Sequence, residues 1–168
     1  MRRRGKILLF LLASAPVLLW VLSSYLNNGG LRVTMEFQKM GTAKIKIIND
    51  EAQILELEVK IADEPDERAA GFQNISRSIM EKTLILFVFP GEINVLFHMR
   101  NVEASLDIAF IKADGTIVWI VHMDPSPTKL YGVDESFKYA IEAPPGFFEE
   151  KKITPGKSKL IVESVPSS

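Results

Sequence analysis

A two-residue alternation of apolar and charged side chains restricts the fold of this chain more than any other feature. It is clearest in residues 55–61, which read LELEVKI, and it recurs in residues 31–37 (LRVTMEF) and, more weakly, in residues 44–47 (KIKI). Successive side chains of a strand point to opposite faces, so each segment is predicted to be a strand with one buried face. With a turn at Asn49-Asp50, these segments predict a meander that contains a hairpin.

A second group of strands is predicted to be buried on both faces. Residues 84–89, 106–111 and 117–121 are almost entirely apolar and are bounded by Gly, Pro or Asp, which is typical of covered strands at the centre of a fold. Trp119 is therefore expected in the core, the alternative being a sugar-stacking ring. Asp114-Gly115 supplies the positive φ of a tight turn, so the last two segments are predicted to form a hairpin. Further strands are predicted at 137–141 and 160–162.

Helix signals are few. The best is Pro65–Phe72, because Asp63 or Glu64 can cap its free amides, Pro65 fits a first turn and Gly71 can end the helix. A shorter helical turn is predicted within residues 146–151. The fold class expected is mainly β: a single sandwich-like or barrel-like domain at 31–168 with one or two short helices, preceded by an N-terminal transmembrane helix.

The N-terminus has the pattern of a membrane anchor. Four basic residues within the first six precede Ile7–Leu26, a run of 20 uncharged residues that as a helix would span a bilayer. The positive-inside bias then places the C-terminal domain on the extracytoplasmic side, after a hinge at Asn27–Gly30. Ala13-Ser14-Ala15 resembles a cleavage site, but Pro16 follows it, so we expect an uncleaved anchor; a cleaved signal and a buried core helix are the alternatives.

Composition excludes several classes of function. The 168 residues include 20 basic and 21 acidic residues for a net charge of −1, and the basic residues do not gather with aromatics into a phosphate-binding surface, so nucleic acid is not expected as a partner. The chain has no cysteine, which excludes disulfides, thiolate nucleophiles and thiolate metal ligands. No phosphate-binding glycine loop, nucleophile elbow or H-E-x-x-H motif occurs. Enzymatic activity is left open, and no cofactor is assigned.

Five pieces of the sequence, taken in order, carry a resemblance to a known family. They read ADEPDERAAGF (62–72), LFVF (86–89), FHMRN with LDIAFI (97–111), DGTIV (114–118), and AIEAPPG with ITPG (140–156). Over about residues 54–162 the chain resembles the DUF192 family (also called UPF0127), small and often exported domains. The resemblance implies a compact β domain of sandwich type and no established reaction. The chain departs from the family pattern at His98, Val102 and Ser105, and at Leu84.

A ligand site is predicted where the third of these pieces falls. His98 and Arg100 end a predicted strand on the same side, and Asn101 begins the following loop. Asp107 is a carboxylate inside an apolar strand and requires a partner or an opening. His98, Arg100, Asn101 and Asp107 are therefore the predicted ligand-binding residues, for a carboxylate, phosphate or sugar. The alternative is structural: Arg100, Asn101 or loop amides bond Asp107, and His98 packs as a half-buried ring.

Two weaker hypotheses concern the segment after the central hairpin. His122 and Asp124 could join His98 in a metal site with two histidines and one carboxylate, but a strand-end His-Met-Asp before Pro125 is also ordinary turn chemistry, and no metal is assigned. The irregular stretch Asp124–Gly132 could be a lid over a cleft or a rigid, proline-braced loop.

The leading functional hypothesis is a membrane-anchored, extracytoplasmic envelope domain that binds a small polar or anionic ligand or a partner protein without catalysis. The alternatives are a hydrolase that acts on an envelope or extracellular glycan, with Asp107 as acid or base, and a structural module of a membrane assembly.

Overall fold

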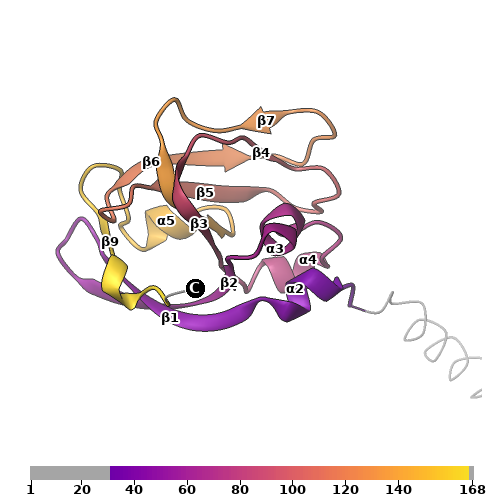
Figure 1. Ribbon diagram of the computed structural model, residues 1–168, viewed down its shortest axis with the longest axis horizontal. Helices are drawn as coiled ribbons and strands as arrows, with labels where there is room; N and C mark the ends of the chain where they lie inside the picture. The colour runs from indigo at the N-terminus through magenta and orange to yellow at the C-terminus, as the bar shows by residue number, and fades with distance from the viewer. Residues whose placement is uncertain (1–30, 167–168) are drawn as a thin grey trace, which may run out of the picture. The chain divides into compact units, whose positions relative to one another are not determined.

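A curled seven-stranded sheet organises residues 31–166, the part of the chain that the computed structural model describes (Figure 1). Its strand order is β6-β5-β8-β3-β2-β1-β9, and only β2 and β3 are parallel neighbours. Beside it, β4 (Phe97–His98) and β7 (Leu130–Tyr131) form a two-stranded ribbon. The strands of the large sheet are β1 (Gly41–Ile48), β2 (Ile54–Ala62), β3 (Ile85–Ile93), β5 (Leu106–Ile111), β6 (Ile117–Met123), β8 (Phe137–Ala143) and β9 (Lys159–Ile161). The predicted mainly β, barrel-like class is confirmed.

The described helices are short. They are α2 (Met35–Lys39), α3 (Pro65–Ala70), α4 (Arg77–Met80), α5 (Phe147–Glu150) and the 3₁₀ turn η1 (Val162–Ser164). The predicted helix at Pro65 is confirmed as α3: the Glu67 carboxylate accepts a hydrogen bond from the Glu64 amide at 3.3 Å, and Gly71 ends the helix with φ +47°. The helical turn predicted within 146–151 is α5.

The predicted strand over residues 31–37 is wrong, because a helix begins there. The hydroxyl of Thr34 accepts a hydrogen bond from the amide of Phe37 at 3.3 Å and caps the first turn of α2. Phe37 and Met40 are three residues apart, and both are buried on one side of the helix. Met35, which the alternation predicts to be buried, is 70% exposed.

Both predicted hairpins are confirmed. β1 pairs with β2 from Gly41↔Ile61 to Ile48↔Ile54, with its turn at Asn49. β5 pairs with β6 through the turn that contains Gly115. A Cβ at Gly115 would lie 2.0 Å from the carbonyl oxygen of Leu160, and its φ is +86°, so this turn requires glycine.

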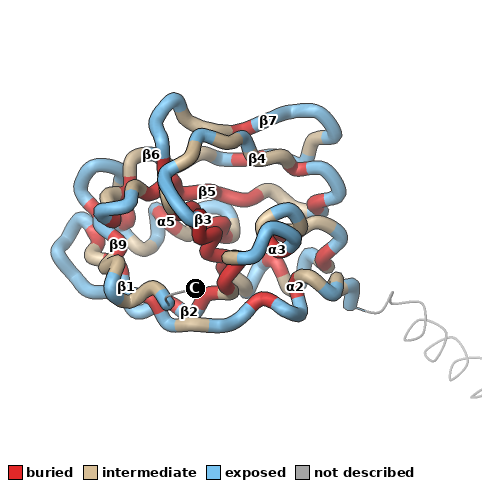
Figure 2. Tube along the Cα trace, viewed as in Figure 1, coloured by how far each residue is buried: buried red, intermediate tan, exposed pale blue. Residues whose placement is uncertain are grey.

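Each face of the large sheet carries its own apolar cluster. Figure 2 shows buried residues along β3 and β5, in the middle of the domain. Directly paired residues of neighbouring strands project to the same face, so the register assigns every side chain to a face. What we call the first face bears Phe87, Ile108 and Phe110, and residues from the α2–α4 segments and from the β4–β7 ribbon pack on it. The second face bears Leu86, Ala109 and Ala143, with Phe148 of α5 packed on it.

The prediction of a buried Trp119 is wrong. Its side chain is 57% exposed, whereas every residue of β5 is buried, as expected. The reason is position in the sheet: β6 is an edge strand, and an apolar sequence alone does not distinguish an edge strand from a central one.

The predicted transmembrane helix falls at residues 7–26, outside the described residues. Between residues 31 and 166, no helix is both long and apolar enough to cross a membrane.

Candidate functional site

The four predicted ligand-binding residues lie at three different places. His98 belongs to the β4–β7 ribbon, which packs over the first face of the sheet. Arg100 and Asn101 lie in the turn that follows β4. Asp107 is paired with Ala143 in the register and therefore projects from the second face. The structure does not bring the four side chains into one site.

Asp107 is engaged in two structural hydrogen bonds. Its Oδ1 lies 2.7 Å from Nδ1 of His122, and its Oδ2 accepts a hydrogen bond of 2.7 Å from the amide of Gly146. The suggested pairing with Arg100 is therefore wrong, while the alternative of a loop amide is confirmed. Together these bonds connect β5 to its hairpin partner and to the loop that leads into α5.

His122 is held between two carboxylates. Opposite its contact with Asp107, its Nε2 lies 3.3 Å from Oδ1 of Asp124, which also accepts a hydrogen bond of 2.8 Å from the hydroxyl of Ser105. The hydrogen bond to Asp107 is the main cause that raises the pKa of His122, and the bond from Ser105 is the main cause that lowers the pKa of Asp124. Asp107, His122 and Asp124 thus form a continuous chain of polar contacts at one end of the β5–β6 hairpin.

The metal hypothesis is not supported by this geometry. His122 pairs with Asp107 on the second face, whereas His98 belongs to the ribbon over the first face. Among residues 31–166, no group of three or more His, Cys, Asp or Glu side chains is arranged to hold a metal ion.

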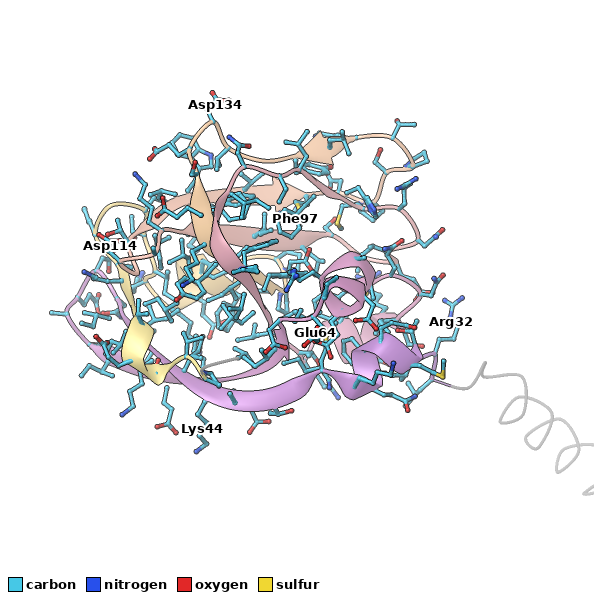
Figure 3. All side chains as sticks on the ribbon, viewed as in Figure 1. Arg32, Lys44, Glu64, Phe97, Asp114 and Asp134 are labelled. Carbon is cyan, nitrogen blue, oxygen red and sulfur yellow. The ribbon has the colours of Figure 1, made fainter. Side chains whose placement is uncertain are left out.

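A separate cavity of ≈ 230 Å³ lies between α3, β3, β4 and β8 on the first face. Its apolar wall includes Phe87, Phe89 and Phe97. The rings of Phe87 and Phe97 meet edge to face, with centroids 5.2 Å apart. Figure 3 labels Phe97, whose ring lies inside the domain between the ribbon and the large sheet. The polar residues that line the cavity are Arg68, Gln73, His98 and Glu142.

Glu142 is the most unusual residue of this cavity. It lies in β8, an inner strand of the sheet, paired with Ile108 on one side and Ile85 on the other, and is only 5% exposed. Its Oε2 has no hydrogen-bond partner. Burial raises the pKa of Glu142 to about 8, so the carboxyl group carries a proton at neutral pH and is a hydrogen-bond donor.

His98 contributes a second unpartnered atom. Its Nδ1 is buried without a hydrogen bond, and in the described part of the chain Nδ1 of His98 and Oε2 of Glu142 are the two buried side-chain polar atoms in this condition. Buried polar groups in native proteins are nearly always paired, so each exception requires an explanation. Both residues line the same cavity, which suggests that a ligand supplies the missing partners.

Two further residues shape the cavity. Nη1 of Arg68 donates to the carbonyls of Asp63 and Val88, and its guanidinium lies 5.5 Å from the ring centroid of Phe89. At Gly71, an added Cβ would lie 3.6 Å from Oε2 of Glu142, so glycine leaves space beside the carboxyl group. The sequence analysis assigns no ligand role to Gly71 or Glu142, although the single carboxylate in the apolar segment YAIEA gives the same signal as Asp107.

Arg100 and Asn101 border a broader cavity of ≈ 610 Å³, which is also lined by residues 125–127 and shares Gln73 and Val102 with the first cavity. The two ends of the irregular stretch Asp124–Gly132 are joined by hydrogen bonds between Tyr131 and Asp124. The Tyr131 hydroxyl donates to the Asp124 carbonyl at 2.9 Å and accepts from the Asp124 amide at 3.0 Å. Leu130 and Tyr131 of this stretch also pair with β4. These contacts favour a rigid loop over a mobile lid.

Comparison with known proteins identifies relatives by sequence pattern and by fold. Residues 46–160 match the family model DUF192, described as "Uncharacterized ACR, COG1430". No curated protein matches the chain. A crystal structure from Sinorhizobium meliloti 1021, described as a candidate transcription regulator, superposes with a TM-score of 0.66 and 24% identity over 75% of this chain and 97% of that one. A protein of unknown function from Novosphingobium aromaticivorans DSM 12444 superposes with a TM-score of 0.64 and 16% identity over 79% and 93%. At these identities the two structures support the fold alone.

Proposed function

This chain belongs to the DUF192 family, whose description names no reaction, and we propose from its own geometry that it is a non-enzymatic domain that binds a small polar ligand. The ligand would occupy the cavity between α3, β3, β4 and β8. One observation carries the proposal: the two buried polar atoms that lack partners in the described chain, on His98 and Glu142, both belong to residues of this cavity.

Binding is favoured over glycan hydrolysis by the number of carboxyl groups. Glycosidases ordinarily place two carboxyl groups across the scissile bond. Among the described residues that line the cavity, Glu142 supplies the one carboxyl group. Asp107, the residue considered as acid or base, projects from the opposite face of the sheet and is bonded to His122 and Gly146.

Replacing Glu142 should stabilise the protein while it removes binding. Glu142→Met keeps the length of the side chain and removes a buried carboxyl group without a partner, so we expect the free energy of unfolding to rise by about 2 kcal/mol. A residue kept for binding is often one whose removal stabilises the fold. The measurement is urea unfolding of the full chain in mild detergent, followed by a thermal-shift screen with small carboxylates, sugars and amines.

The matched control is Glu58→Met, which replaces an exposed glutamate of β2 and should leave both stability and ligand shifts nearly unchanged. A Glu142→Met protein that responds to the same ligands as the wild type would refute the proposed site.

We also propose, from the sequence, that Ile7–Leu26 anchors the domain in a membrane and that the domain faces the extracytoplasmic side. The uncharged length of this segment and the basic residues before it support the proposal. In a bacterial host, the full chain should remain in the membrane fraction after carbonate extraction, and a tag after Ser168 should be cleaved by protease added outside the inner membrane. Recovery of the full-length chain in the soluble fraction would contradict it.

A further inference from the structure

We infer that the ligand of this cavity carries a carboxylate group, which accepts a hydrogen bond from the carboxyl group of Glu142, and an apolar body that packs against the phenylalanine rings. This inference rests on the proposed function and adds the chemical class of the ligand.

The charges around the cavity favour an anion. The charged or titratable residues that line it are Arg68 from α3, His98 from β4 and Glu142 from β8. Because the pKa of Glu142 is raised to about 8 by burial, the lining carries no negative charge at neutral pH, whereas the guanidinium of Arg68 is always positive. A cation would find no counter-charge here unless Glu142 first lost its proton.

The hydrogen-bonding capacity of Glu142 also favours a carboxylate. A protonated carboxyl group needs an acceptor, and residues that flank Glu142 in the sheet, Ile85 and Ile108, provide none from their side chains. A ligand carboxylate would form a charge-assisted O–H···O⁻ bond, roughly twice as strong as a bond between neutral groups. At Gly71 no side chain crowds Oε2, because an added Cβ there would lie 3.6 Å from that oxygen.

The walls indicate the rest of the ligand. Phe87, Phe89 and Phe97 line the cavity, and its volume of ≈ 230 Å³ suits a small molecule with one ring or a short alkyl chain. The apolar body would gain free energy from burial against these rings, while the carboxylate would determine its orientation.

The test compares ligands with similar skeletons and different charge. Isothermal titration of the full chain with benzoate, phenylacetate, their primary amides and the corresponding benzylic amines should show the tightest binding for the carboxylates at pH 7. Between pH 7 and pH 9 the affinity for benzoate should fall about tenfold, because Glu142 loses its proton and two carboxylates then repel each other.

Glu142→Gln keeps a donor and has no proton to lose, so it should still bind benzoate, with no change of affinity between pH 7 and pH 9. Tighter binding of the amines, strengthened by rising pH and lost in Glu142→Gln, would overturn the carboxylate inference and leave the proposed binding site standing. If no carboxylate binds, the inference that the ligand is a carboxylate is wrong. The proposed binding function is tested separately, by the thermal-shift screen that also includes sugars and amines.

Discussion

Raising the pH from 5 to 9 should lower the free energy of unfolding of this protein by several kcal/mol, and Glu142→Gln should remove most of that loss. The pKa of Glu142 is raised from 4.5 to about 8 by burial. Between these values the unfolded chain has released a proton that the folded chain keeps, so stability falls as the pH rises. The gap is 8 − 4.5, about 3.5 pH units, and at ~1.4 kcal/mol per unit the full loss is on the order of 5 kcal/mol, of which about 4 kcal/mol falls between pH 5 and pH 9.

The measurement is urea unfolding of wild type and Glu142→Gln at pH 5, 7 and 9, with Glu58→Gln as the exposed control. The decline should begin above about pH 4.5 and level off above about pH 8. A wild-type protein equally stable at pH 5 and pH 9 would show that Glu142 titrates normally and is hydrated or paired.

His122 also makes the protein less stable as the pH rises, but its effect is weak. Its pKa is raised, mainly by the hydrogen bond to Asp107, so its contribution to stability is present below its ordinary value of 6.5 and is lost as the pH rises through its folded value. Its side chain is 52% exposed, and solvent screens the interaction. The loss that remains in Glu142→Gln should therefore be small and should lie above pH 6.5.

Asp107→Ala should destabilise the domain by about 3 kcal/mol. The substitution removes both acceptors of a largely buried carboxylate, so the amide of Gly146 and Nδ1 of His122 lose their partners. Because these bonds connect β5, β6 and the loop before α5, the loss should appear as a lower urea midpoint with an unchanged m-value.

Two substitutions serve as controls for Asp107→Ala. Asp124→Ala leaves the bond between His122 and Asp107 in place, and Arg100→Ala removes an exposed side chain that does not bond Asp107, so both should change the urea midpoint little. If Arg100→Ala destabilises the protein as much as Asp107→Ala does, the bonds of Asp107 to His122 and Gly146 do not account for the structural role of Asp107.

Much of the fold could be predicted because its signals are local. The hairpin between β5 and β6 follows from Asp114-Gly115 between two apolar segments, and α3 follows from Pro65 at its start and Gly71 at its end. The errors arise where a local pattern fits two structures. Residues 31–37 alternate like a strand, but the cap at Thr34 and the burial of Phe37 and Met40 favour a helix, and only packing decides between them.

The candidate site could be predicted only in part. His98 was singled out and lines the cavity, whereas Arg100 and Asn101 border a different one. Asp107 and Glu142 give the same signal, a single carboxylate in an apolar strand. The register separates them: Glu142 lies opposite Ile108 on the first face, and Asp107 lies opposite Ala143 on the second.

The sequence by itself determined the β character of the domain, its two hairpins, the helix at Pro65 and its family, because these depend on residues close together in the chain or on an ordered set of motifs. Only the tertiary structure decided which carboxyl group is satisfied and which is not. Asp107 finds His122 and the amide of Gly146, 15 and 39 residues away, whereas burial leaves Oε2 of Glu142 unpartnered beside Gly71. Such pairings depend on strand register and on contacts between distant segments, which no local pattern of side chains specifies.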